Sequence, residues 1–312
     1  MKKSLLALAA LTAFAGAASA QSSVTLYGRV DLSVAKNLGS DAKEMQNGSG
    51  SRLGLRGSED LGGGLSALFN IEHRFNADTG ADSTGGLRFW NGRSLVGLKG
   101  GFGQVVFGRE YTTSFLGTQL WADPWGWDTI ANQAGLTGLG IAKVRNDSSA
   151  TYNVASGGFS FGIQIAEATD TINKFQAKPL NFNVGYAAGP LRASFGYEKT
   201  GSEAAGNEKM WSTAISYDLG MVKPGFYYGK GTTVSDASNK AWMLTATAPM
   251  GAGEFRASYG RLKSNDTTLS KRLALGYHYS MSKRTTLYVD FANDSELNDN
   301  KSAYDVGLKH NF

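Results

Sequence analysis

The strongest constraint in this sequence is a two-residue alternation of apolar and polar side chains that runs almost from end to end. In the segment SSVTLYGRVDLSVA, one face of an extended chain would carry Val24, Leu26, Gly28, Val30, Leu32 and Val34. The segments KRLALGYHYS and RTTLYVDFAND alternate in the same way, and so does the closing stretch from Tyr304 to Phe312. A period of two residues indicates β-strands that have one apolar and one polar face.

The polar faces carry too many charges to form the buried core of a protein. A soluble β-sandwich packs large apolar side chains between its two sheets, so a sandwich or a propeller does not fit these strands. If the polar face lines water, the apolar face must point outward, into lipid. Lipid does not tolerate unpaired sheet edges, so the last strand must close on the first. We therefore expect a closed transmembrane barrel.

The connections between the alternating segments are of two kinds that follow each other along the chain. One kind is short and glycine-rich, as in EDLGGG, ASGGF and AAGPL. The other kind is longer and polar, as in KNLGSDAKEMQNGSG, TDTINKFQAK, TGSEAAGN and KSNDTTLS. This pattern is typical of an up-and-down barrel with tight turns at one rim and loops at the other. Counting the segments predicts about sixteen strands, an even number as in bacterial single-chain barrels, in one domain over residues 21–312.

The first twenty residues have the features of a cleaved signal peptide rather than a membrane anchor. Lys2 and Lys3 precede a short apolar region, and Ala18, Ser19 and Ala20 supply the small residues of a cleavage site. Their removal lowers the formal net charge from +5 to +3, which is too mild to predict nucleic-acid binding. The absence of cysteine excludes a disulfide framework and thiol chemistry.

One long stretch, from Tyr111 to Lys143, interrupts the alternation. It contains Trp121, Trp125 and Trp127 among apolar residues. Long loops without regular structure are uncommon and usually functional. We expect this segment to fold into the barrel, with an external loop packed on its neighbours as the alternative.

Arginines gather on the faces that should line the lumen. In SRLGLRGSED, Arg52 and Arg56 share one face, and Arg93 and Arg145 flank the long segment. A ring of like charges selects against ions of the same sign, so the cluster predicts anion preference. The alternative is that these arginines only pair with Glu59, Asp60 or Glu72.

Two other function classes compete with a channel. An enzyme needs a nucleophile beside a base, and the three histidines, His73, His278 and His310, form no such motif or metal cluster. We therefore expect no catalytic residue, no metal and no cofactor; acidic loop residues in NDSELNDN are better explained as solvated charge than as calcium ligands. A barrel adhesin or receptor acting through its external loops remains the alternative function.

Four stretches resemble the Gram-negative general-diffusion porins, most closely the trimeric porins of beta-proteobacteria. They are QSSVTLYGRVD, SRLGLRGSEDLGGGLSALF, LVGLKGGFGQVVFGRE and the closing strand. The resemblance covers nearly all of residues 21–312. It implies a 16-stranded antiparallel transmembrane β-barrel with a long third loop folded into the lumen. It also implies a homotrimer in the lipid of the cell outer membrane that passes small hydrophilic solutes and anions.

The same resemblance implies roles for particular residues. Arg52, Arg93 and Arg145 match the arginines that face the third loop in anion-selective members, and Arg56 and Arg74 extend this positive ladder. Asp123 and Asp128 are the candidate acids of the loop. The terminal Phe312 is similar to the signal that the outer-membrane assembly machinery reads.

Overall fold

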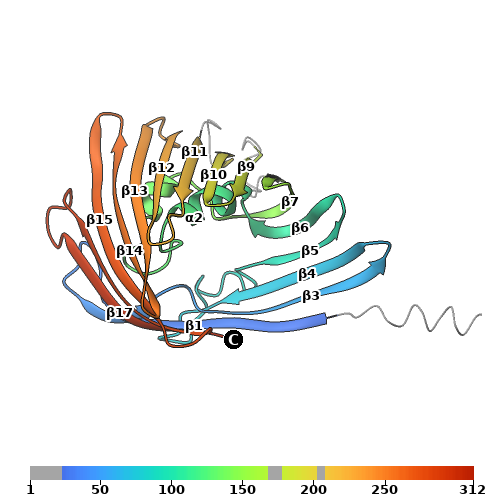
Figure 1. Ribbon diagram of the computed structural model, residues 1–312, viewed down its shortest axis with the longest axis horizontal. Helices are drawn as coiled ribbons and strands as arrows, with labels where there is room; N and C mark the ends of the chain where they lie inside the picture. Colours follow the sequence, from blue (N-terminus) through green and yellow to red (C-terminus); the bar gives the residue numbers. More distant parts are fainter. Residues whose placement is uncertain (1–22, 168–177, 202–207) are drawn as a thin grey trace, which may run out of the picture.

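The computed structural model describes residues 23–167, 178–201 and 208–312, which form one closed antiparallel sheet (Figure 1). The expected signal peptide, residues 1–20, lies outside the described residues, as do most of TDTINKFQAK and TGSEAAGN. The strands are β1 (Ser23–Lys36), β2 (Lys43–Asn47), β3 (Arg52–Gly62), β4 (Leu65–Arg74), β5 (Ser94–Gly100), β6 (Gly103–Tyr111), β7 (Arg145–Ser156), β8 (Phe159–Ala166), β9 (Leu180–Ala188), β10 (Leu191–Lys199), β11 (Lys209–Tyr217), β12 (Lys223–Thr232), β13 (Ser238–Met250), β14 (Gly253–Ser264), β15 (Thr267–Ser280), β16 (Thr285–Asp294) and β17 (Ser302–Asn311).

These strands fill sixteen positions around the barrel, as predicted. Both β2 and β3 pair with β1, one along each half of its length, so the two strands together fill one position. Each later strand pairs with the next, and β17 pairs with β1 to close the ring. At the seam, the backbone N–H of Gly28 donates to the Phe312 carbonyl at 2.9 Å, and the Phe312 N–H donates back at 3.1 Å.

The aromatic residue at the chain end fits a gap in the first strand. A Cβ atom at Gly28 would lie 2.3 Å from the Phe312 ring, so only glycine leaves room for the ring there. The ring lies on the outer face and is 42% exposed. The final residue therefore takes part in the seam through both its backbone and its side chain.

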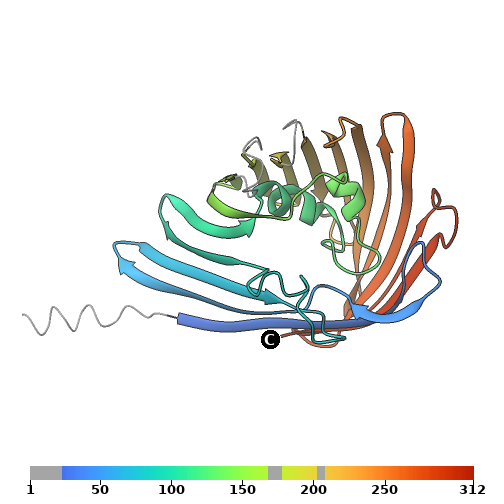
Figure 2. The same ribbon diagram turned by 180° about the vertical axis from the view of Figure 1, so that it is seen from behind.

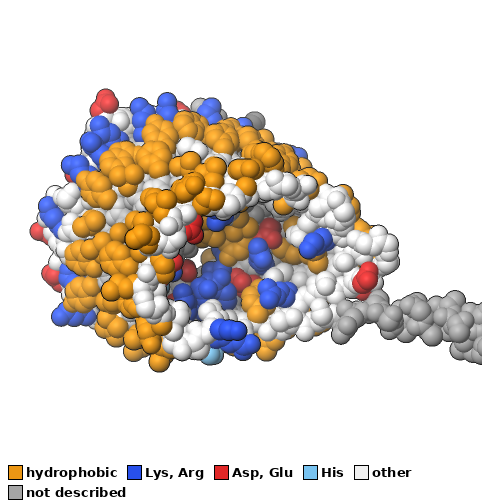
Figure 3. Space-filling view, viewed as in Figure 1, with side chains coloured by type: hydrophobic (Ala, Val, Ile, Leu, Met, Phe, Trp, Pro, Cys, Tyr) orange, Lys and Arg blue, Asp and Glu red, His pale blue; other side chains and the backbone are white. Residues whose placement is uncertain are grey.

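The predicted alternation is confirmed on the strands. On β16, Leu287, Val289 and Phe291 point outward and are exposed, whereas Tyr288 and Asp290 point inward and are buried. Figure 3 shows hydrophobic side chains over much of the outer surface, mainly on the left and upper side, and a hollow that contains lysines and arginines together with some acidic side chains. This arrangement suits a barrel with lipid outside and water inside.

Short turns and longer loops occupy opposite rims, with two departures from the expected lengths. The stretch KNLGSDAKEMQNGSG contains the strand β2, which divides the predicted loop into two shorter connections. KSNDTTLS is a tight turn at Asn265 and Asp266 instead of a loop, because Asn265 adopts a φ of 51°, which asparagine tolerates well. Both loops were predicted too long because the water-exposed ends of long strands are as polar as loop residues, so composition does not distinguish them.

The segment between β6 and β7 lies inside the ring of strands (Figure 2). It contains η1 (Phe115–Gln119), α2 (Leu120–Ala122) and α3 (Ala134–Gly138). Two buried apolar clusters join it to the barrel: Leu136, Leu139 and Ile141 pack against β11–β14, and Trp125 and Ile130 pack near alanines of β15–β17. In this structure the segment predicted to fold inward therefore packs against the inner face of the strands. None of the helices in the described ranges is long and apolar enough to cross a membrane.

Candidate functional site: an arginine-lined cavity

Three arginines lie directly opposite one another on neighbouring strands. In the sheet register Arg29 of β1 pairs with Arg52 of β3, and Arg52 pairs with Arg74 of β4. Like charges in directly opposed positions destabilise a sheet. The row therefore carries an electrostatic cost, which indicates a function other than stability.

Tyr111, the last residue of β6, connects this row to two further arginines. The Arg145 guanidinium lies over its ring at 4.0 Å from the centroid, and that of Arg93 lies at 4.9 Å. The Tyr111 hydroxyl accepts hydrogen bonds from Arg74, at 2.6 Å, and from Arg145. Cation–π contacts and a shared acceptor hold the three guanidinium groups in place without neutralising them.

Arg52 is held by backbone carbonyl groups. Its Nη2 donates to the Ser49 carbonyl at 2.9 Å, and its Nε donates to the Gly50 carbonyl at 3.0 Å. Both carbonyls belong to the break between β2 and β3, where Gly50 adopts a φ of 56°. The interruption of this barrel position thus supplies acceptors that orient the arginine and leave its charge in place.

The internal segment faces the arginines with one carboxylate, that of Asp128. Its Oδ2 atom lies 3.2 Å from Arg29 Nη1, and the same nitrogen donates to the Ser49 hydroxyl at 3.1 Å. Burial raises the pKa of the Asp128 carboxyl to about 6, and the nearby charges of Arg29 and Arg52 oppose that rise. A cavity of about 460 Å³ lies between the segment and the wall, and its lining includes Arg29, Arg52, Arg74, Tyr111, Asp128 and Arg145.

The charges around this cavity do not cancel. Three of the five arginines have a carboxylate partner: Arg29–Asp128 at 3.2 Å, Arg74–Glu72 at 2.8 Å and Arg93–Glu110 at 2.9 Å. Within the described residues, Arg52 and Arg145 have no carboxylate at ion-pair distance. The site therefore carries an excess of two positive charges, contributed by two partly buried arginines that line the cavity.

The structure brings most of the predicted site residues together and places one of them elsewhere. Arg52, Arg74 and Arg145 lie together at the cavity, Arg93 joins them through Tyr111, and Asp128 faces them as expected. Arg56 lies away from the cavity, above the Tyr27 ring at 5.1 Å. Of the acids that were alternatives as arginine partners, Glu72 pairs with Arg74, and neither Glu59 nor Asp60 forms an ion pair among the described residues.

The expectation for Asp123 is wrong. Its side chain is only 3% exposed, and its carboxylate accepts backbone hydrogen bonds from Trp125, Trp127 and Gln133 at 2.8–3.0 Å. An aspartate that binds nearby N–H groups in this way shapes a turn. Asp123 therefore stabilises the internal segment and does not face the arginines.

Sequence reasoning missed Tyr111 and Ser49 and did not place Arg29 in the site. The alternation along the strand places Arg29 on the inward face, but it does not show which residues of the neighbouring strands lie beside it. The aromatic residue that ends the strand before the internal segment was the available signal for Tyr111. Nothing in the sequence pattern indicated the break that presents Ser49.

The wall opposite the arginines binds the internal segment. Trp125 Nε1 donates to Asp290 Oδ1 at 2.7 Å, and His278 Nε2 lies 3.1 Å from the same oxygen. The Tyr227 hydroxyl donates to the Thr137 carbonyl at 2.6 Å. These contacts fix the segment on one side, so the cavity remains on the arginine side.

The comparisons with known proteins agree with this architecture. The family model described as Gram-negative porin matches residues 7–300. Outer membrane porin protein 32 of Delftia acidovorans is 35% identical, over 99% of this chain and 93% of its own length. An outer membrane porin protein of Bordetella pertussis is 30% identical over the full length of both chains.

Two solved structures share the fold. The anion-selective porin from Comamonas acidovorans superposes with a TM-score of 0.81 at 27% identity, covering 94% of this chain and 100% of that one. The trimer form of OmpT from Vibrio cholerae superposes with a TM-score of 0.73 at 16% identity, covering 93% and 99% of the two chains. The second similarity is evidence for the fold alone.

Proposed function

The chain belongs to the Gram-negative porin family, and from this premise we propose that its pore prefers anions through Arg52 and Arg145. The protein is an outer-membrane porin, a passive channel for small hydrophilic solutes and ions, and not an enzyme. The observation that carries the proposal is the excess of two positive charges beside the cavity. The similar structure from Comamonas acidovorans, which is titled an anion-selective porin, supports the same direction.

In this proposal the two arginines without carboxylate partners contribute most to the anion preference of the pore. Arg29, Arg74 and Arg93 each share their charge with a carboxylate at 2.8–3.2 Å, so their fields at the pore centre are weaker. Arg52 and Arg145 attract chloride or carboxylate anions without holding them tightly, because carbonyls and a tyrosine occupy some of their donors. Weak attraction suits conduction, which requires release as well as entry.

Assembly and export belong to the same proposal. We propose that residues 1–20 are removed as a signal peptide and that Phe312, at the seam with Gly28, contributes to recognition by the assembly machinery. We also propose a homotrimer surrounded by outer-membrane lipid, since the similar OmpT structure is titled a trimer form. The exposed apolar side chains of the strands fit both lipid and subunit contacts.

The direct test is the reversal potential of single channels in a planar bilayer under a KCl gradient. We expect a potential of the sign that chloride preference produces. A cation-preferring channel would keep the porin assignment and reject the roles of Arg52 and Arg145. A folded barrel without conductance would reject the channel and favour the adhesin alternative.

A further inference from the structure

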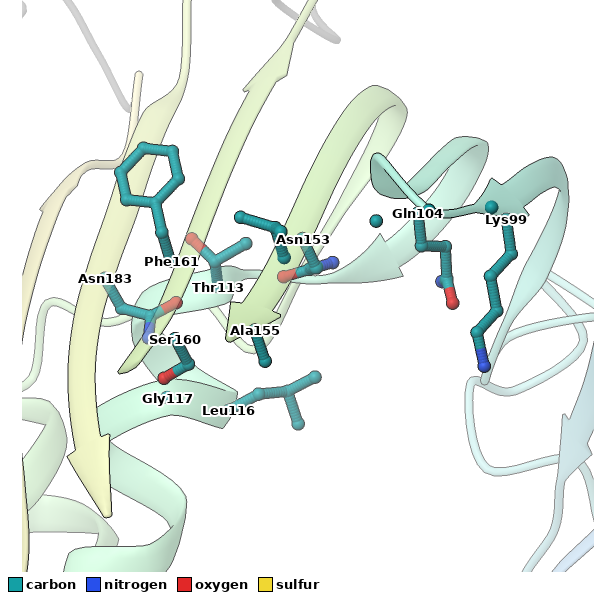
Figure 4. Close-up of a pocket in the computed structure, with 14 residues that line it drawn as sticks. Lys99, Gln104, Thr113, Leu116, Gly117, Asn153, Ala155, Ser160, Phe161 and Asn183 are labelled. Carbon is teal, nitrogen blue, oxygen red and sulfur yellow. The ribbon is translucent and has the colours of Figure 1, made fainter. Parts of the chain in front are cut away.

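A second polar surface lines the lumen away from the arginines, and it carries amides. In the sheet register Lys99 of β5 pairs with Gln104, Gln104 with Asn153, Asn153 with Gly162, and Gly162 with Asn183. The row crosses β5 to β9 at one level. Figure 4 shows Gln104, Asn153, Asn183 and Ser160 around the pocket that they line. We call this surface the amide row.

The side-chain amides of the row have hydrogen-bonding capacity that no described protein group uses, and Asn183 among them is only 6% exposed. Among the described residues the side-chain amides of Gln104, Asn153 and Asn183 have no hydrogen-bond partner, unlike the amide of Asn181 on β9, which binds Thr113 and Gln164. A Cβ atom at Gly162 would lie 2.6 Å from the Asn183 amide oxygen and 2.7 Å from that of Asn153. The two oxygens therefore converge over a position that only glycine leaves open.

The internal segment covers this row from the lumen side. Thr113, Leu116 of η1 and Gly117 line the same pocket of about 510 Å³, and Leu116 is 38% exposed. The pocket thus combines several polar groups, which both donate and accept, with an apolar side chain on the opposite side. Ligand pockets commonly combine a few placed polar groups with apolar contacts.

We propose that this pocket is a weak binding site for uncharged polyhydroxylated solutes such as sugars. An amide offers two donors and an acceptor, which match neighbouring hydroxyls on a sugar ring, and Leu116 can contact its apolar C–H face. The row from Gln104 to Asn183 spans three strand spacings, about 14 Å, and so can contact more than one ring. Lys99 at its end is the one charged residue of the pocket and has no carboxylate partner among the described residues.

This inference rests on the proposed channel function but not on its anion preference. Anions are drawn to the arginine cavity, whereas an uncharged sugar gains nothing from that field. The amide row provides such solutes with a separate contact along the lumen, where they replace water without leaving a buried group unpaired. One pore would thus offer different surfaces to anions and to sugars.

The test measures block of single-channel KCl current by maltose added to both sides of a planar bilayer. We expect concentration-dependent current interruptions in the unaltered protein. In the double variant Asn153→Ala/Asn183→Ala, the half-blocking concentration should rise by more than about fivefold, the factor that corresponds to one typical hydrogen bond. The matched control is Thr247→Val, which changes a lumen side chain of β13 in a different cavity and should leave the block unchanged.

A second variant keeps the amides but displaces them. Gly162→Ala should push both amide oxygens aside and weaken the block, while conductance in KCl without sugar stays the same. Equal block in all variants, or no block of an otherwise conducting channel, would overturn the inference and leave the porin function standing. A bilayer that stays silent in KCl would instead overturn the proposed function itself.

Discussion

The two sides of the lumen use the same inward-facing positions in opposite ways. On β1, β3, β4 and the start of β7, which we call the arginine wall, Arg52 and Arg145 keep their charges exposed to the cavity. On β10–β17, the docking wall, Glu198, Tyr227, Asn239 and Asp290 are buried because they bind the internal segment. Facing inward therefore does not determine a role; contact with the internal segment does.

The difference follows from what the internal segment needs. Its irregular backbone leaves N–H and C=O groups that must find partners when they are buried. The docking wall supplies them: Asn239 donates to the Leu139 carbonyl at 2.7 Å, and Glu198 accepts from the Lys143 N–H at 2.9 Å. The segment touches the arginine wall at fewer points: Asp128 pairs with Arg29 at 3.2 Å, and the Thr129 N–H donates to the Gly48 carbonyl at 2.7 Å. Arg52 and Arg145 are left to face the cavity.

The largest expected effect is on selectivity, from Arg52→Gln/Arg145→Gln. Removing both exposed charges should abolish most of the chloride preference. The permeability ratio should fall about fivefold for each charge removed, because one unit charge at 4 Å in a water-like medium contributes about 1 kcal/mol. The permeability ratio from reversal potentials measures this. As a control, Arg109→Gln removes a charge that pairs with Asp147 at 2.6 Å and should change the ratio little.

The second-largest expected effect comes from Trp125→Phe, which should weaken the attachment of the internal segment to the docking wall. The variant leaves Asp290 without the indole donor, and loss of a partner to a buried group costs about 1–3 kcal/mol. We expect noisier open-channel current and a lower unfolding temperature with an unchanged permeability ratio. Trp211→Phe, on the outer surface, is the matched control; equal noise in both variants would contradict the docking role.

A smaller effect should follow the titration of Asp128. Its pKa of about 6 lies above the ordinary value, so the carboxylate becomes neutral as the pH falls through 6 rather than through 4. Loss of its negative charge beside Arg29 should raise the chloride preference between about pH 7.5 and pH 5. Asp128→Asn should show the higher preference at both pH values, and a pH response that persists in this variant would assign the titration to another group.

The smallest effect is expected from Tyr111→Phe. The ring stays between Arg93 and Arg145, but the hydroxyl that accepts from Arg74 and Arg145 is lost. We expect a shift in the permeability ratio of about twofold, less than one lost hydrogen bond can produce, because water in the cavity replaces the acceptor. Tyr111→Ala, which also removes the ring, should shift the ratio further; an equal shift would show that stacking contributes nothing.

Alternation predicted the barrel well because it reports the environment of each strand face directly. It placed Phe312 outward and Asp290 inward, and both positions are observed. It could not show which inward residues meet, since that depends on the register between strands and on the path of the internal segment. Arg52 and Arg145 were identified through the resemblance to porins. Tyr111 was not identified, and Asp123 was assigned to the pore although its partners lie within its own loop.

The measurement that tests the separation of the two walls most directly is a paired recording of Arg52→Gln/Arg145→Gln and Trp125→Phe under one KCl gradient. The arginine variant should lose chloride preference with quiet open-channel current, and the tryptophan variant should keep the preference with noisy current. If the arginine variant retained the full chloride preference, or the tryptophan variant lost it, the division of the lumen into a selecting wall and a docking wall would be wrong.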